Sequence, residues 1–209
     1  ADAHPEIKTI DDALARPDLF PSVENKKRGV IYGCPSGWAC QITTAQAFKA
    51  WDAKKKGFDL KDPGSAAGLD GAIAKSYQRQ EPWLGYYWAP TSILGKYKMV
   101  KLDAGVPFDQ AEWDRCNSQA RCADPKKNDW SKSDVVTVVT DNFKKSGGDA
   151  NEYLSKRAWG NDTVNQLLAW MSDNQATGED GARYFLKNNI DVWSDWVSPA
   201  IAAKIKGAI

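Results

Sequence analysis

The sequence has only one histidine, His4, in 209 residues, and no apolar run approaches the ~20 residues that a helix needs to cross a bilayer. It also has no excess of one charge: 28 lysines and arginines against 27 aspartates and glutamates give a net charge of +1. Both signs are mixed along the chain without a basic stripe, so neither nucleic acid nor an anionic membrane is expected as a partner. His4 has no serine near it, and we expect it to face solvent rather than to act in a catalytic triad. The first residues also lack a signal-peptide pattern, as expected of a mature or shortened form.

Tryptophan is the residue type that stands out. There are ten tryptophans, more than a core of this size usually needs, although the hydrophobic share of 42% is ordinary for a globular protein. The length suits one sizeable domain or two small lobes. Aromatic faces are therefore the feature that a functional hypothesis has to explain.

The four cysteines fall into two pairs with the same spacing, Cys34 with Cys40 and Cys116 with Cys122. Five residues separate the members of each pair. Structural zinc sites usually have two to four intervening residues and often recruit histidine. The spacing therefore favours two short-range disulfides over a four-cysteine metal site or free thiols, and we expect neither a metal nor a cofactor. Disulfides indicate an oxidising compartment, which is a periplasm or the cell exterior.

Apolar and β-branched runs alternate with helical patterns over the first two thirds of the chain, which predicts an α/β fold. A helix is expected over residues 43–54 and another after Ser65, which is a good N-cap. Five strands are predicted, at residues 30–32, 58–61, 83–88, 99–102 and 135–140. The polar segment 103–134 is too long for a simple connection, and we expect the second cysteine pair to pin it.

After Thr140 the pattern is helical. One helix should end at Gly178, a capping box of Thr177 with Asp180 should start the next, and Ser198 before proline should start the last. The apolar face of the first of these helices is formed by Val164, Leu167, Leu168 and Met171. Four tryptophans in this half are interpreted as core residues: Trp159, Trp170, Trp193 and Trp196.

The segment 34–40, with the sequence CPSGWAC, is the first candidate binding site. A ring this small cannot bury the indole of Trp38, so that side chain should project, and Gly37 lets the backbone turn close to a ligand. If a helix starts just after the ring, the amides of Ala39 and Cys40 are free to bind an anion. One loop would then offer a π-face to a cation and amides to a carboxylate. The alternative is that Trp38 packs onto the sheet as a lid.

The second candidate lies in segment 81–90, EPWLGYYWAP. On an extended strand Tyr86 and Trp88 share one face, while Tyr87 points to the other. Trp88 lies at the carboxyl end of the predicted strand, where open α/β sheets place ligands, and aromatic faces attract quaternary ammonium groups. The alternative is an aromatic core strand.

Two other function classes stay open. A carbohydrate-binding or carbohydrate-active protein could use Trp38 and Trp88 as sugar platforms, but catalysis would need a pair of carboxylates, and only Asp62 and Glu81 are near in sequence. A structural or protein-binding module with a tryptophan-rich core is the other alternative. We expect the chain not to be an enzyme.

Four segments together resemble the substrate-binding proteins of glycine betaine/proline betaine/choline ABC importers. They are 34–40 (CPSGWAC), 62–69 (DPGSAAGL), 81–90 (EPWLGYYWAP) and 173–179 (DNQATGE). The resemblance implies a type II periplasmic-binding-protein-like fold that catches a quaternary-ammonium ligand and delivers it to a membrane permease. It implies that Trp38 and Trp88 pack on the trimethylammonium group, while the amides of Ala39 and Cys40 hold a ligand carboxylate.

The resemblance also predicts a domain organisation. Residues 1–102 would form one complete lobe, with a parallel or mixed sheet flanked by helices. Residues 103–134 would be the disulfide-pinned segment, and 135–209 a strand and helices that return to the other lobe. Members of this family are longer, and the part not matched here supplies another aromatic wall. We therefore expect weaker ligand binding, and apolar helix surface that favours self-association.

Overall fold

The computed structural model describes residues 4–209, which divide into two compact units. The first unit consists of the residues up to Trp88 together with Tyr97–Lys132. The second unit consists of Ala89–Lys96 together with Ser133–Ile209. Each unit has its own apolar core, so each is described by itself.

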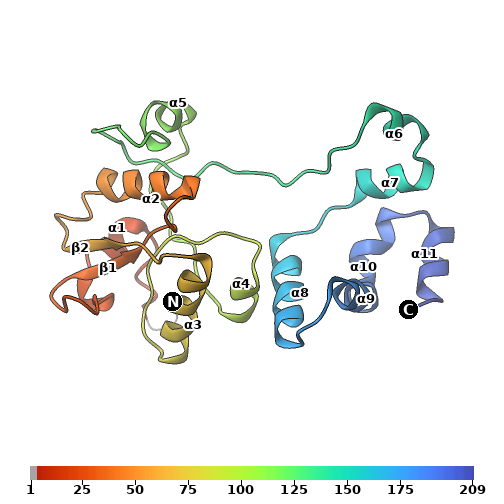
Figure 1. Cartoon of the computed structure of the whole chain (residues 1–209), viewed down its shortest axis with the longest axis horizontal. Helices are drawn as coiled ribbons and strands as arrows, with labels where there is room; N and C mark the ends of the chain where they lie inside the picture. The colour runs from red at the N-terminus through yellow and green to blue at the C-terminus, as the bar shows by residue number, and fades with distance from the viewer. Residues whose placement is uncertain (1–3) are drawn as a thin grey trace. The chain divides into compact units, whose positions relative to one another are not determined.

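The first unit contains the two strands and the helices that pack on them (Figure 1). Its elements are α1 (Ile10–Leu14), β1 (Gly29–Tyr32), α2 (Ala39–Ala50), β2 (Phe58–Lys61), α3 (Ala66–Gln78) and α5 (Gln110–Glu112). A 3₁₀ turn covers Pro17–Leu19, and a π-helical turn covers Trp113–Asn117.

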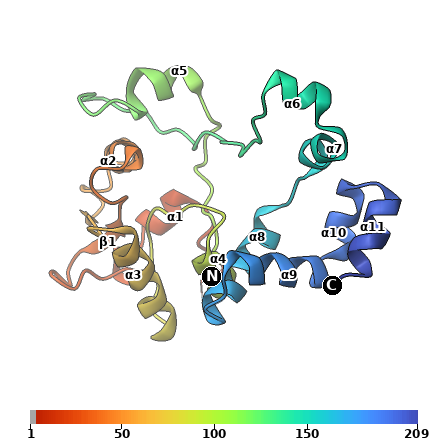
Figure 2. The same ribbon diagram turned by 45° about the vertical axis from the view of Figure 1, so that its right-hand side comes forward.

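The second unit is helical, and α9, α10 and α11 gather at the carboxyl end of the chain (Figure 2). Its helices are α4 (Ser92–Lys96), α6 (Asp141–Ser146), α7 (Gly148–Lys156), α8 (Asn161–Asp173), α9 (Gly178–Asn188), α10 (Ile190–Trp193) and α11 (Pro199–Lys206). A 3₁₀ turn covers Ser194–Trp196. Within residues 4–209, none of the helices has both the length and the apolar character of a membrane span.

The strands β1 and β2 pair in parallel, with Gly29 opposite Phe58. Parallel neighbours need a crossover connection, and α2 supplies it. The guanidinium of Arg28 fixes the start of the pair, since it donates to both carboxylate oxygens of Asp59 at 2.9 Å. On the other side of β1, Gly85 forms a single parallel bridge to Tyr32.

The core of the first unit lies where α1 and α2 pack on the strands, and Phe58 at its centre is fully buried. The buried members of this core are Ala13, Leu14, Phe20, Trp51, Ala53, Phe58 and Ala104.

The core of the second unit is built from Phe185, Trp193, Trp196 and Ala202. The prediction of core positions is confirmed for Trp193 and Trp196, which are buried. It is wrong for Trp159, which lies outside the helices and is 41% exposed, although its ring packs edge-on against Phe185 and Trp196.

Three of the predicted strands are not regular strands. Residues 83–88 have only an isolated bridge at Gly85, residues 99–102 form no strand, and residues 135–140 are exposed without regular structure. Val135 is 96% exposed and Val138 86%. A β-branched run becomes a strand only when a neighbouring backbone pairs with its amides and carbonyls, and within residues 4–209 no strand or bridge pairs with 135–140.

The predicted helix starts are confirmed where a side chain caps the helix. Ser65 accepts from the amide of Gly68, and Thr177 forms a capping box with Asp180. Ser198 accepts from the amide of Ile201 and so opens α11. The end predicted at Gly178 is wrong, because α8 ends at Asp173 and Gly178 is the first residue of α9.

Replacing Gly29 with alanine should lower the free energy of unfolding by about 1–3 kcal/mol, because a Cβ there would lie 2.4 Å from Cε1 of the fully buried Phe58 ring. The matched control is Gly71→Ala in α3, where nothing lies within 4 Å of the added Cβ. That change should raise stability by about 0.5–1 kcal/mol through helix propensity. Urea denaturation measures both, and equal effects of the two substitutions would contradict the packing argument.

Candidate ligand-binding site

The first predicted disulfide is confirmed: Cys34 and Cys40 are bonded, with their Cα atoms 5.6 Å apart. The ring they close lies between β1 and α2 and contains Gly37, whose φ of +88° favours glycine. Trp38 occupies the N-cap of α2 in an extended backbone conformation and is 43% exposed. The indole therefore projects from the ring, as the ring size predicts.

The first turn of α2 offers free amides next to Trp38. The Trp38 amide donates to the carbonyl of Pro35 at 3.3 Å, and the Gln41 amide donates to the carbonyl of Trp38 at 3.0 Å. Between them, the amides of Ala39 and Cys40 find no acceptor among residues 4–209. The first helical turn carries no acidic residue either. A helix start of this kind attracts an anion through its free amides and the helix dipole.

The indole of Trp88 lies directly beside that of Trp38. Their ring centroids are 5.3 Å apart and their planes are tilted by 59°. The two rings are too close for a ligand to insert between them. A cation that contacts both tilted faces can still lie within about 6 Å of both centroids, which is the range of a cation–π contact. Trp88 is partly buried. The structure thus brings the two predicted aromatic residues together.

Both tyrosines before Trp88 pack on its indole, contrary to the prediction that they point to opposite faces. The Tyr87 ring is stacked at 4.6 Å and the Tyr86 ring at 6.2 Å. The alternation fails because residues 83–88 do not form a regular strand. The Tyr87 hydroxyl also donates to Asp70 Oδ1 at 2.6 Å, which ties this aromatic group to α3.

Two tryptophans that sequence reasoning did not single out extend the aromatic series. The Trp130 ring lies 5.1 Å from Tyr86, and the Trp113 ring lies 5.7 Å from Trp130. Burial among these rings raises the pKa of the Tyr86 hydroxyl. Both tryptophans lie in the polar segment 103–134, so no local pattern points to them.

The disulfide ring 34–40 is hydrogen-bonded to the loop that follows β2. The Ser36 hydroxyl donates to Asp62 Oδ2, and Gln41 Nε2 donates to Ser36 Oγ at 3.0 Å. Asp62 Oδ1 accepts from the Gly64 amide at 2.8 Å. The hydrogen bond from Ser36 lowers the pKa of the Asp62 carboxyl, and that from Gly64 adds to the effect. An ionised carboxylate therefore stands beside the ring at neutral pH.

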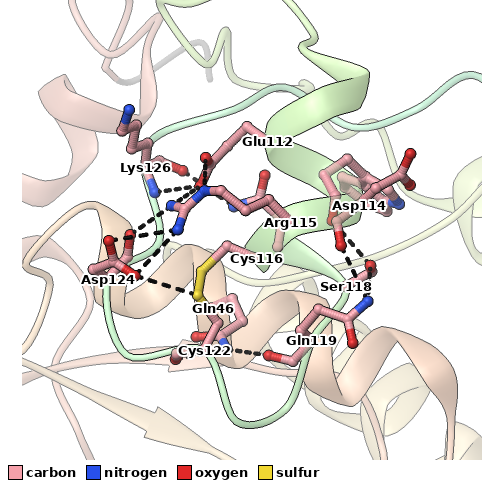
Figure 3. The surroundings of a disulfide bond; sticks show 12 residues. Gln46, Glu112, Asp114, Arg115, Cys116, Ser118, Gln119, Cys122, Asp124 and Lys126 are labelled. Carbon is pink, nitrogen blue, oxygen red and sulfur yellow. Dashed lines mark hydrogen bonds and ion pairs between the residues drawn. A yellow bond between two sulfur atoms is a disulfide. The ribbon is translucent and has the colours of Figure 1, made fainter.

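The second predicted disulfide, between Cys116 and Cys122, is also confirmed (Figure 3). The side chain of Gln46 in α2 is buried and holds this loop, since Nε2 donates to the carbonyls of Gln119 and, at 3.1 Å, Cys122. The disulfide loop is thereby anchored to the helix that Trp38 caps.

An ion pair between the buried Glu112 and the partly exposed Arg115 also holds this loop (Figure 3). The guanidinium of Arg115 donates to both carboxylate oxygens of Glu112, at 2.8 and 3.0 Å. The hydrogen bonds from Arg115 are the main reason that the pKa of the Glu112 carboxyl is lowered. A hydrogen bond from the amide of Lys126 lowers it further. Asp124 lies near both sulfurs, but their disulfide bond removes the thiolates that a metal would need.

A family model described as the substrate-binding domain of ABC-type glycine betaine transport systems matches residues 1–188. Among solved structures, the chain is similar to the glycine/betaine/L-proline-binding protein (ProX) of a glycine betaine, L-proline ABC transporter from Borrelia burgdorferi. The sequence identity is 18%, and the TM-score is 0.52. The match covers 97% of this chain and 66% of the Borrelia protein.

These matches confirm the predicted fold class. The fold is α/β and type II periplasmic-binding-protein-like, with a small parallel sheet and flanking helices. The chain spans less than two thirds of the length of the solved protein.

Replacing Gln46 with alanine should lower the free energy of unfolding by about 1–3 kcal/mol, because two loop carbonyls lose their donor. Lys49→Ala is the matched control, since Lys49 is exposed on the same helix and its loss should change stability by less than about 0.5 kcal/mol. Urea denaturation followed by tryptophan fluorescence measures both. A Gln46→Ala protein as stable as the Lys49→Ala control would mean that the hydrogen bonds of Gln46 contribute nothing to the free energy of unfolding.

Proposed function

The chain belongs to the family of substrate-binding domains of ABC-type glycine betaine transport systems, and we propose that it binds a quaternary-ammonium osmolyte at the junction of Trp38 and Trp88. Glycine betaine, proline betaine and choline are the candidate ligands. The contact between the two indoles, with centroids 5.3 Å apart, is the observation that carries the proposal. It joins one exposed aromatic face to a second aromatic side chain from a different loop.

The two ends of the ligand have different partners. The trimethylammonium group packs on Trp38 and Trp88, because a large cation with a thin hydration shell gains from aromatic faces. Where the ligand has a carboxylate, this group accepts hydrogen bonds from the amides of Ala39 and Cys40. Gly37 contributes backbone only, so the loop can approach the ligand closely.

We propose the remaining functional assignments with family membership as their support. The protein works outside the cytoplasm, in a periplasm or on the cell exterior, and two disulfides are in keeping with such an oxidising compartment. It delivers its ligand to the membrane permease of an ABC importer and catalyses no reaction. The assignment of residues 1–102 to one lobe, and self-association through apolar surface, stay predictions.

Isothermal titration with choline and with glycine betaine tests the proposal. Trp38→Ala and Trp88→Ala should each weaken binding by about twofold to thirtyfold, the factor that corresponds to about 0.5–2 kcal/mol per aromatic contact. The control is Tyr77→Ala, which removes another aromatic side chain of the first unit, 49% exposed on α3. Binding by this control should equal that of the unchanged protein.

Two further ligands make the test specific. The neutral tert-butyl isostere of choline has the same shape without the charge and should bind more weakly than choline if cation–π attraction is at work. A neutral sugar addresses the carbohydrate alternative. Binding of the sugar without binding of either quaternary amine would overturn the proposal in favour of that alternative.

A further inference from the structure

Asp62 is an ionised carboxylate held beside the candidate site without a cationic partner. Its oxygens accept hydrogen bonds from the Ser36 hydroxyl and the Gly64 amide, and within residues 4–209 it forms no ion pair. Two other acidic groups near the strands do have cationic partners: Asp59 pairs with Arg28 at 2.9 Å, and Asp11 pairs with Lys56 and Lys127. Neutral donors orient a carboxylate but leave its net charge in place.

The charge of Asp62 acts at the end of the site where a ligand carboxylate would lie. Ser36, whose hydroxyl donates to Asp62, lies three positions before Ala39 in the same disulfide ring. The Cα atoms of Ser36 and Ala39 are therefore at most about 10 Å apart, even if this stretch of chain is fully extended. Asp62 is exposed, and this range is slightly longer than the Debye length of about 8 Å at physiological ionic strength, so salt weakens the interaction there and low salt strengthens it. Gln41 also bonds to Ser36, so the carboxylate is held by the first turn of α2.

We propose that Asp62 is a specificity-determining residue, which weakens binding of zwitterionic betaines relative to carboxylate-free cations such as choline. The inference rests on the proposed function of the same site. Asp62 repels the carboxylate of a betaine and attracts the ammonium of any ligand. Both ligand types gain from the attraction, but only the betaine meets the repulsion.

A second role for Asp62 has to be separated from this one. Its bond to the Gly64 amide, two residues on, shapes the turn between β2 and α3, as aspartate commonly does after a strand. A turn role depends on the side chain's shape, whereas the selectivity role depends on its charge. Two substitutions therefore distinguish the roles: Asp62→Asn keeps the shape and removes the charge, and Asp62→Glu keeps the charge.

The experiment measures the dissociation constants of choline and of glycine betaine for each protein by isothermal titration. At ~0.01 M salt, where the Debye length is about 30 Å, Asp62→Asn should strengthen betaine binding relative to choline binding by about twofold to tenfold, as expected for a unit charge about 10 Å away at effective dielectric constants between about 20 and 80. Asp62→Glu should keep the original ratio. The matched control is Asp52→Asn, an exposed aspartate paired with Lys55 beyond the other end of α2, about 18 Å away.

A salt series on the unchanged protein gives an independent measurement. Raising the salt from ~0.01 M to ~1 M shortens the Debye length from about 30 Å to about 3 Å, which screens the charge of Asp62. The ratio of the choline and betaine dissociation constants should therefore move toward that of the Asp62→Asn protein. An unchanged ratio in Asp62→Asn overturns the inference, as do equal shifts in the Asn and Glu variants. If the unchanged protein binds neither choline nor betaine, the proposed function itself fails, and this inference fails with it.

Discussion

The contact between the indoles of Trp38 and Trp88 depends on a constraint on the backbone around residue 38. The disulfide ring places Trp38 at the N-cap of α2, so its indole and the free amides of the next two residues share one helix end. Trp88 also has to lie beside this helix end. The bridge between Gly85 and Tyr32 in β1 fixes the segment 83–88 that carries it. A cation site and an anion site are thereby joined within one small region.

A contact in the middle of α2 also maintains the position of this helix. Gln46 is buried and bonds to the second disulfide loop, which Arg115 and Glu112 hold in shape. This explains how a polar segment without regular strands contributes to an aromatic region: its disulfide fixes it to α2, and Trp130 then packs on Tyr86. The two disulfide loops thus both act on α2, one at its first turn through Cys40 and the other further along through Gln46.

Features with local causes could be predicted from the sequence, and features that need a distant partner could not. The caps at Ser65 and Thr177 follow from hydrogen bonds within one turn, and both disulfides follow from spacing. The strand predicted at 135–140 has strong β-propensity, but a strand also needs a neighbour. Trp130 was missed for the same reason, since its contact with Tyr86 spans sequence-distant segments. The sequence alone indicates no selectivity role for Asp62, because its hydrogen bond to Ser36 joins segments that are distant in the sequence.

Selectivity among quaternary-ammonium ligands has to come from the polar end of the site. Choline and betaine carry the same trimethylammonium group, so the indoles alone cannot tell them apart. The start of α2 attracts a carboxylate with about half a positive charge and two free amides, while Asp62 opposes it with a full negative charge at longer range. A direct hydrogen bond to a charged group gives about 1.5–3 kcal/mol, more than the repulsion across about 10 Å. The amides should therefore dominate for a ligand that reaches them, and Asp62 should narrow the preference for betaine without reversing it.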